Sequence, residues 1–265
     1  MACKGAILSS EQKQKKTALV VIFLTVFIDL VGFGIIIPLS PYLARQFSAS
    51  PLQVGLLMSV YSLMQFIFSP LWGRVSDRVG RRPLILMSLL GSALSYCGFA
   101  FASTLTGLFV ARAFAGIFGA SISTVMAYIA DVTPENERSK GMGLIGAAFG
   151  LGFIFGPFIG GICGGFGESL GDAPPFGMSF SALVAALVCF LNFIVAIFTL
   201  RESLPVEKRS VIKTRESRMT LIVRFLGKPV IGQLILVLFF STFAMAQMES
   251  TLFLFVKDKF GWGVT

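Results

Sequence analysis

Long apolar segments, separated by shorter polar stretches, follow one another along the whole chain. Seven such segments lie at roughly 17–43, 52–72, 84–102, 105–129, 140–162, 179–200 and 230–256. A helix needs about 20 mostly apolar residues to cross the hydrocarbon core of a bilayer, and each segment has about that length. A spanning helix also satisfies its backbone polar groups internally, so we expect an all-α membrane protein with seven transmembrane helices.

The composition agrees with this pattern and limits the classes of protein that remain. Hydrophobic residues make up 55% of the chain and charged residues only 13%, unlike a soluble globular domain. The formal net charge is +9, which on its own also suits a nucleic-acid-binding protein. Here, however, the basic residues lie at the ends of the apolar segments rather than on one polar face. We therefore expect the lipid bilayer as partner, and no nucleic acid.

The basic residues are distributed unevenly among the connecting segments. Of the 22 Lys and Arg residues, 18 fall in the N-terminal tail and in every second connection after it, whereas three fall in the alternate set. The positive-inside rule places the richer set in the cytoplasm. We therefore expect a cytoplasmic N-terminus.

Four parts of the chain follow from these segments. Residues 1–16 form a cytoplasmic tail, and residues 17–200 hold six spans that we interpret as one transmembrane bundle. Residues 201–229 are a basic cytoplasmic linker with an interfacial helix expected at Thr220–Leu226, and residues 230–265 hold the first helix of a second bundle.

Side chains that support catalysis or metal binding are scarce. The chain has no histidine, which excludes imidazole-based zinc sites and His-assisted nucleophiles. Its four cysteines show neither close pairing nor the spacing of metal ligands. We therefore predict a protein that is not an enzyme, with no cofactor, no metal site and no disulfide framework.

A charged segment of eleven residues, 73–83, separates the second and third apolar segments. Gly73 and Gly80 permit tight turns in the loop that we expect here, and Asp77 can accept hydrogen bonds at a helix start or pair with Arg78 or Arg81. The order of glycines, acid and arginines resembles the signature between the second and third helices of the major facilitator superfamily. That resemblance implies a conformational latch made by these residues, namely Gly73, Asp77, Arg78, Gly80, Arg81 and Arg82. The alternative is a loop whose positive charges only anchor the protein on the cytoplasmic side of the membrane.

Two charged residues lie inside the first and fourth apolar segments. Burial disfavours the ionised form of Asp29, so its carboxylate is a candidate for proton or substrate binding; the alternative is a helix-packing acid. Arg112 stays charged and must face a cavity or a carboxylate, with Asp29 as a candidate partner. The residues around Arg112 resemble the fourth-helix motif that is associated with proton movement in the superfamily. The alternative to such a role is a structural ion pair.

The fifth segment carries glycines at every fourth position. Gly152, Gly156 and Gly160 share one helix face, which admits a neighbouring helix at short distance, and Pro157 is expected to kink the helix. Together with Gly161, this pattern resembles the fifth-helix motif that marks antiporters within the superfamily.

Three further polar residues lie within apolar segments. Glu249 is a second candidate proton site, with a polar helix contact as the alternative, and Gln65 is a candidate for the cavity lining or for helix packing. Ser95 stands where the tetracycline-resistance exporters, which the chain resembles from Asp29 to Trp262, carry an acid. The absence of that acid leaves general multidrug efflux open and weakens the case for tetracycline.

The resemblance implies a major facilitator fold whose six-helix bundle is a 3+3 inverted repeat. It also implies five more helices beyond Thr265, so we expect the C-terminal half to be absent from this chain. We predict a monomeric, proton-coupled exporter of small lipophilic drugs that works by alternating access in a bacterial inner membrane. The alternatives are a solute importer on the same fold and a membrane scaffold or fragment that does not transport.

Overall fold

A computed structural model describes the backbone of residues 2–171, 173–209 and 224–260. Side chains are described within residues 17–171, 173–207, 209, 224–248, 255 and 259. The chain divides into a first unit that extends to Arg209 and a second unit at 210–263.

Within the described ranges the regular elements are helices, and no strand occurs there. The first unit contains α1 (Ala2–Gln46), α2 (Pro51–Val79), α3 (Arg81–Ala100), α4 (Leu105–Gly119), α5 (Ile122–Val132), α6 (Arg138–Leu170) and α7 (Phe180–Thr199). Single 3₁₀ turns lie at η1 (Glu135–Glu137), η2 (Gly177–Ser179) and η3 (Val206–Lys208). The second unit contains α9 (Pro229–Phe260).

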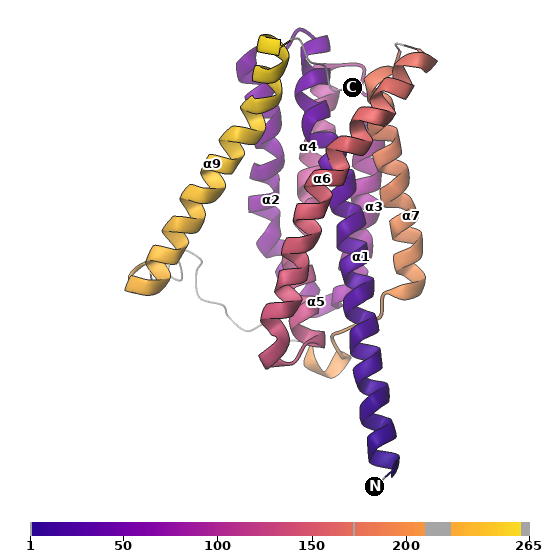
Figure 1. The fold of residues 1–265 in the computed structure, drawn as a ribbon, viewed down its shortest axis with the longest axis vertical. Coiled ribbons are helices and arrows are strands. Elements are labelled where there is room, and N and C mark those ends of the chain that lie inside the picture. Colours follow the sequence, from indigo (N-terminus) through magenta and orange to yellow (C-terminus); the bar gives the residue numbers. More distant parts are fainter. Residues whose placement is uncertain (1, 172, 210–223, 261–265) are drawn as a thin grey trace. The chain divides into compact units, whose positions relative to one another are not determined.

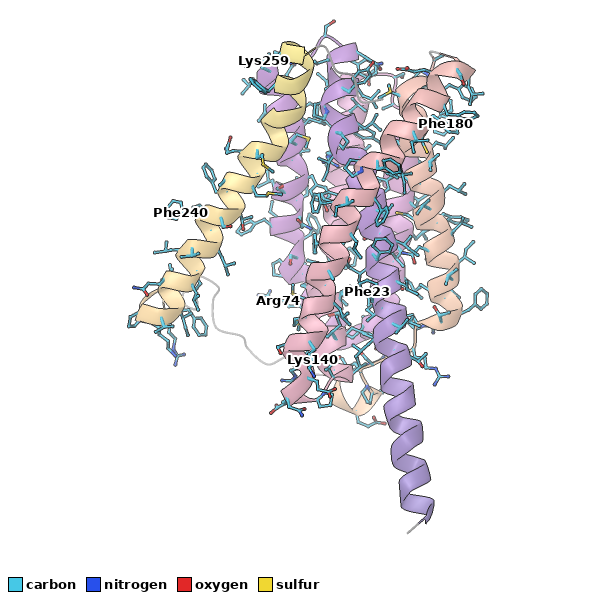
Figure 2. All side chains as sticks on the ribbon, viewed as in Figure 1. Phe23, Arg74, Lys140, Phe180, Phe240 and Lys259 are labelled. Carbon is cyan, nitrogen blue, oxygen red and sulfur yellow. The ribbon has the colours of Figure 1, made fainter. Side chains whose placement is uncertain are left out.

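Seven stretches of the described chain are long and apolar enough to cross a membrane, which confirms the predicted spans. Their bounds are Thr17–Gln46, Pro51–Val79, Arg81–Ala100, Leu105–Val132, Glu135–Leu170, Gly177–Thr199 and Pro229–Met248. In the first unit the helices run side by side along one axis (Figure 1). Arg74 and Lys140 lie toward one end of this bundle and Phe180 toward the other (Figure 2).

The prediction of a loop over residues 73–83 is wrong. Helix α2 continues through Val79 and α3 begins at Arg81, so Gly80 alone separates them. Nothing between Gly73 and Val79 forces a helix to end, because the stretch contains no proline and its two arginines are good helix formers. Gly80 has a φ of 115°, which an L side chain rarely adopts, and it therefore provides the whole turn.

The fourth predicted span is confirmed as Leu105–Val132, but it is not a single helix. The span divides into α4 and α5 at Ala120 and Ser121. Side chains of α2 bind carbonyl groups next to the break: the Gln65 Nε2 donates to Gly119 O at 3.0 Å, and the Trp72 indole N–H donates to Ile117 O. A break within a membrane is tolerated where such donors satisfy the freed carbonyl groups.

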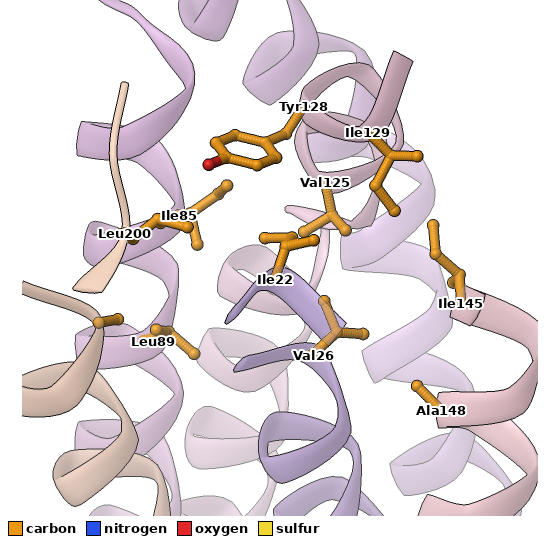
Figure 3. Packing of buried hydrophobic residues seen from close by; sticks show 11 residues of the cluster. Ile22, Val26, Ile85, Leu89, Val125, Tyr128, Ile129, Ile145, Ala148 and Leu200 are labelled. Carbon is orange, nitrogen blue, oxygen red and sulfur yellow. The ribbon is translucent and has the colours of Figure 1, made fainter. Parts of the chain in front are cut away.

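An apolar core lies where α1, α3, α5, α6 and α7 meet. The ring of Tyr128 points toward Ile85 and Leu200 within this core (Figure 3). All of its members are at least nine-tenths buried; they are Ile22, Val26, Ile85, Leu89, Val125, Tyr128, Ile129, Ile145, Ala148, Ala196 and Leu200. Ile85 and Ile129 lie four and two residues from Arg81 and Asp131, whose contacts are described below.

Phe239 stacks on Phe243 with ring centroids 6.2 Å apart, and the described side chains of α9 are mostly exposed. Most of the interfacial helix predicted at Thr220–Leu226 lies outside the described residues. Its last three positions, from Arg224, are helical.

Candidate functional site

Asp29 lies in α1 and is half-buried against two other helices. The Cys189 thiol of α7 donates to its Oδ1 with a sulfur–oxygen distance of 3.8 Å, and the Ser92 hydroxyl of α3 also hydrogen-bonds to the carboxylate. Close packing of α1 brings these groups together, because a Cβ at Gly32 would lie 2.7 Å from the Cys189 sulfur and 3.3 Å from the Tyr96 ring. The carboxylate is therefore held by contacts with α3 and α7, near the middle of the membrane-spanning part of α1.

Arg112 of α4 is only 2% exposed and lies between aromatic rings. Its guanidinium carbon lies 4.9 Å from the centroid of Tyr61 in α2 and 5.8 Å from that of Phe33 in α1. The Nη2 atom is 4.0 Å from the Met58 sulfur, whereas Nε and Nη1 have no hydrogen-bond partner. The predicted candidate pair with Asp29 is not formed, since no ion pair joins these two described residues. The negative faces of the two rings compensate the charge only in part.

The glycine face of α6 packs against α1. Gly152, Gly156 and Gly160 are all buried, and a Cβ at Gly156 would lie 2.6 Å from the Cα of Gly34. Only hydrogen atoms fit between the two backbones at this point. Gly161 lies beside this face and is half-buried. Helix α6 is continuous through Pro157, and the kink predicted there stays a prediction.

A cluster of polar residues joins α2, α3 and α5 at the turn around Gly80; we call it the junction cluster and define it as Ser76, Asp77, Arg81 and Asp131. The Arg81 Nη1 donates to Ser76 Oγ and to Asp77 Oδ1, each at 2.6 Å, and its Nε donates to Asp131 Oδ2 at 3.1 Å. Arg81 is buried, so these charge-assisted bonds lie partly out of water. Arg81, one of the two partners that the sequence left open for Asp77, forms this ion pair.

The other charged residues of the eleven-residue segment have separate environments. Arg82 donates from Nη2 to Ile197 O in α7 at 2.6 Å, and Arg78 is exposed at the end of α2. Gly73 lies inside α2, where its carbonyl accepts a bond of 2.8 Å from Ser76 Oγ. Gly73 therefore does not act as a turn residue.

Sequence reasoning missed two residues that belong to this environment. Glu202 accepts backbone hydrogen bonds at the start of α3, and Ser203 donates to Asp131 Oδ2 at 3.1 Å. Their position just after the sixth apolar segment was the available signal, because helix ends on the same side of a membrane lie close together. Asp131, which accepts from Ser203, also accepts from Arg81 Nε.

The remaining candidates serve different purposes. Gln65 makes the cross-helix hydrogen bond that the packing alternative predicts, and the buried Ser95 hydroxyl donates to Gly91 O in its own helix at 2.6 Å. The side chain of Glu249 lies outside the described residues, although its backbone is in α9. No group of three or more acidic, Cys or His side chains in the described part of the chain is arranged to hold a metal ion.

The model of the Major Facilitator Superfamily matches residues 22–265. This chain belongs to that family. The resemblance expected from residues 73–83 is thereby confirmed, and the chain is a multi-pass integral membrane protein of a non-enzymatic family.

Curated relatives include bacterial resistance proteins. The class B and class E tetracycline resistance proteins of Escherichia coli are 37% and 40% identical, over 93% and 92% of this chain and 59% and 58% of their own lengths. Multidrug resistance protein 2 of Bacillus subtilis is 33% identical over 94% of this chain and 60% of its own length. The chain thus spans about three fifths of the length of the relatives that it matches.

Solved transporter structures have the same fold. The human organic anion transporter MFSD10 (TETRAN) superposes with a TM-score of 0.71 and 26% identity, covering 94% of this chain and 67% of that chain. An inward-facing bacterial homolog of the human lysosomal transporter Spinster gives a TM-score of 0.76 at 18% identity, covering 94% of this chain and 57% of that chain. The second likeness concerns the fold alone.

Proposed function

We propose that this major facilitator protein is a proton-coupled exporter of small lipophilic compounds that works by alternating access. The single observation that carries the proposal is the placement of Asp29. A carboxylate in the middle of a spanning helix is costly, and such residues usually mark ion or proton pathways. The thiol and hydroxyl that contact it are neutral donors, so neither of them holds the carboxylate in one charge state. Asp29 can therefore alternate between a protonated and an ionised state.

In this mechanism Arg112 adjusts the field around the proton site. It lies in electrostatic range of Tyr61, as Asp29 does, without forming a salt bridge to Asp29. Arg112 would thereby tune or relay the protons that Asp29 exchanges. Glu249 in α9 is proposed as a second proton site.

The junction cluster serves as the conformational latch. Arg81 ties the end of α2 to the end of α5, and breaking its bonds to Asp77 and Asp131 would release these ends relative to each other. We place this cluster and the N-terminus in the cytoplasm of a bacterium, because 18 of the 22 basic residues lie on that side. The working unit is proposed to be a monomer.

The names of the relatives suggest the substrates. Tetracycline and other lipophilic drugs are the first candidates, since both tetracycline and multidrug resistance proteins align over more than nine-tenths of the chain. Ser95, which bonds within α3, offers a bound drug no carboxylate at the position where tetracycline exporters carry an acid. Multidrug efflux is therefore preferred over tetracycline efflux.

Proton movement in inverted membrane vesicles tests the proposal. The full-length protein is inserted, the interior is acidified, and a panel of lipophilic drugs that includes a tetracycline is added. Drug-dependent loss of the pH gradient is expected for the wild type and for Glu168→Gln, an exposed acid at the end of α6, but not for Asp29→Asn. Drug-dependent proton movement that persists in inserted Asp29→Asn would contradict the role of Asp29.

A further inference from the structure

The carboxylate of Glu202 lies at the N-terminus of α3, next to Arg81, which precedes Glu202 by 121 residues in the chain. Its Oε1 accepts from the backbone N–H of Arg81 at 2.9 Å, and its Oε2 accepts from that of Arg82 at 3.3 Å. The first N–H groups of a helix have no partner within the helix, and a negative charge there also favours the helix dipole. Gly80 precedes α3 and has no side chain that could make these bonds. Glu202 therefore caps α3 from a distance.

The turn at Gly80 leaves just enough room for this carboxylate. A Cβ at position 80 would lie 2.9 Å from the carboxyl carbon of Glu202 and 3.0 Å from Nη2 of Arg209. Glycine is thus needed here for space as well as for its positive φ. The carboxylate, the turn and the start of α3 form one packed unit.

The segment that carries Glu202 is itself fixed to the bundle. Leu200 and Leu204 on either side of it are buried, and the Arg209 Nη2 lies 3.8 Å from Glu202 Oε2. Glu202 Oε1 also accepts from the backbone N–H groups of Ser203 and Leu204, each at 3.1 Å. The first residues of the linker are therefore part of the bundle rather than a free connection.

The hydrogen bonds of Glu202 and Ser203 both connect this segment to Arg81, one directly and one through Asp131. Glu202 binds the Arg81 backbone, and Ser203 donates to the same Asp131 oxygen that accepts from Arg81 Nε. A shift of residues 200–209 would therefore change the backbone position of Arg81 and the orientation of one of its two acidic partners. The linker and the junction cluster are mechanically connected through these bonds.

We propose that Glu202 is a positioning residue of the latch, which holds Arg81 in place to bind Asp77 and Asp131 and transmits movements of the linker to that site. This inference rests on the proposed function, in which the junction cluster closes and opens during transport. In the proposed mechanism the junction cluster controls the opening and closing of the protein and not the binding of substrate, so Glu202 should affect the rate of conformational change.

Steady-state transport by the full-length protein tests this role. Glu202→Gln keeps the shape and one acceptor oxygen of the side chain but removes its charge. We expect turnover to fall about tenfold with an unchanged KM. The free energy lost with a charged helix cap is similar in size to the activation free energy that corresponds to a tenfold change in rate. Glu207→Gln is the matched control, because Glu207 is an exposed acid of the same linker, and it should transport at the wild-type rate.

A double-mutant cycle with Asp77→Asn separates a role through the latch from a general structural role. If Glu202 acts through Arg81, the two substitutions together should slow turnover by less than the product of their separate effects. Ser203→Ala, which removes only the bond to Asp131, should slow turnover in the same direction and provides the test if Glu202→Gln does not insert.

The outcomes distinguish this inference from the proposed latch. Wild-type turnover in both Glu202→Gln and Ser203→Ala, with a slow Asp77→Asn, would overturn the inference and leave the latch intact. Independent effects of Glu202→Gln and Asp77→Asn, or a raised KM, would also overturn it. Wild-type turnover in all three variants would remove the latch and the role of Glu202 together.

Discussion

The guanidinium of Arg112 lies over the ring of Tyr61, 4.9 Å from its centroid, and has no carboxylate partner among the described residues. A buried charge that lacks an ion pair destabilises the fold, and one aromatic face offsets only about 0.5–2 kcal/mol of that cost. Such an arrangement suggests that Arg112 is present for transport rather than for stability.

Replacement of Arg112 should therefore separate stability from activity. We expect Arg112→Met to raise the free energy of unfolding by about 1–3 kcal/mol, because an apolar side chain of similar length suits the buried site. Proton-coupled transport should be lost. Thermal unfolding in detergent and the vesicle assay measure the two effects, with Arg74→Met as an exposed control. A destabilised Arg112→Met protein would show instead that the charge supports the fold.

The junction cluster should discriminate between arginine and lysine at position 81. Arg81 donates to three side chains at once, and lysine cannot reproduce this forked geometry. We expect Arg81→Lys to lower the free energy of unfolding by about 1–3 kcal/mol, since buried acceptors lose their donors. Arg74→Lys, on the exposed side of α2, should leave the unfolding temperature unchanged. Equal unfolding temperatures for the two variants would argue against a structural role of the forked bonds.

The contact between α1 and α6 should reject even one added methyl group. A Cβ at Gly156 would lie 2.6 Å from Gly34 Cα, so the two backbones must separate in Gly156→Ala. Overpacking of this kind typically costs about 1–3 kcal/mol. Gly150→Ala, in the same helix but with nothing within 4 Å of its Cβ, should be neutral or slightly stabilising. The measurement is again thermal unfolding, and identical unfolding temperatures would mean that the two helices pack differently.

Gln65 should be needed at the break between α4 and α5. Gln65→Leu removes the donor to Gly119 O, and a buried carbonyl without a partner costs about 1–3 kcal/mol. Ser59→Ala removes a hydroxyl that bonds only to Gly55 O in its own exposed turn, and it should have little effect. Hydrogen exchange of the amides that follow the break would report the change locally. Unchanged exchange in Gln65→Leu would indicate that another group satisfies the carbonyl.

Hydropathy along the chain was enough to identify a membrane protein and to locate the helices that cross the membrane. Hydrophobic length decides spanning, because an apolar segment of about 20 residues has no better environment than lipid. The same reasoning located Asp29 and Arg112, since a charge inside an apolar segment is visible without any knowledge of the fold. The eleven residues 73–83 were enough to indicate the family, because their signature is local.

The contacts between side chains of different helices could be identified only in the tertiary structure. The predicted pairing of Asp29 with Arg112 is replaced by Cys189 and Ser92 around one residue and by Tyr61 and Phe33 around the other. Glu202 binds the start of α3 although 121 residues separate it from Arg81 in the chain, and no local sequence pattern predicts such a contact. The break at Ala120 likewise depends on donors from α2. Hydropathy is a property of each segment alone, whereas these contacts depend on how neighbouring helices are rotated and shifted against each other.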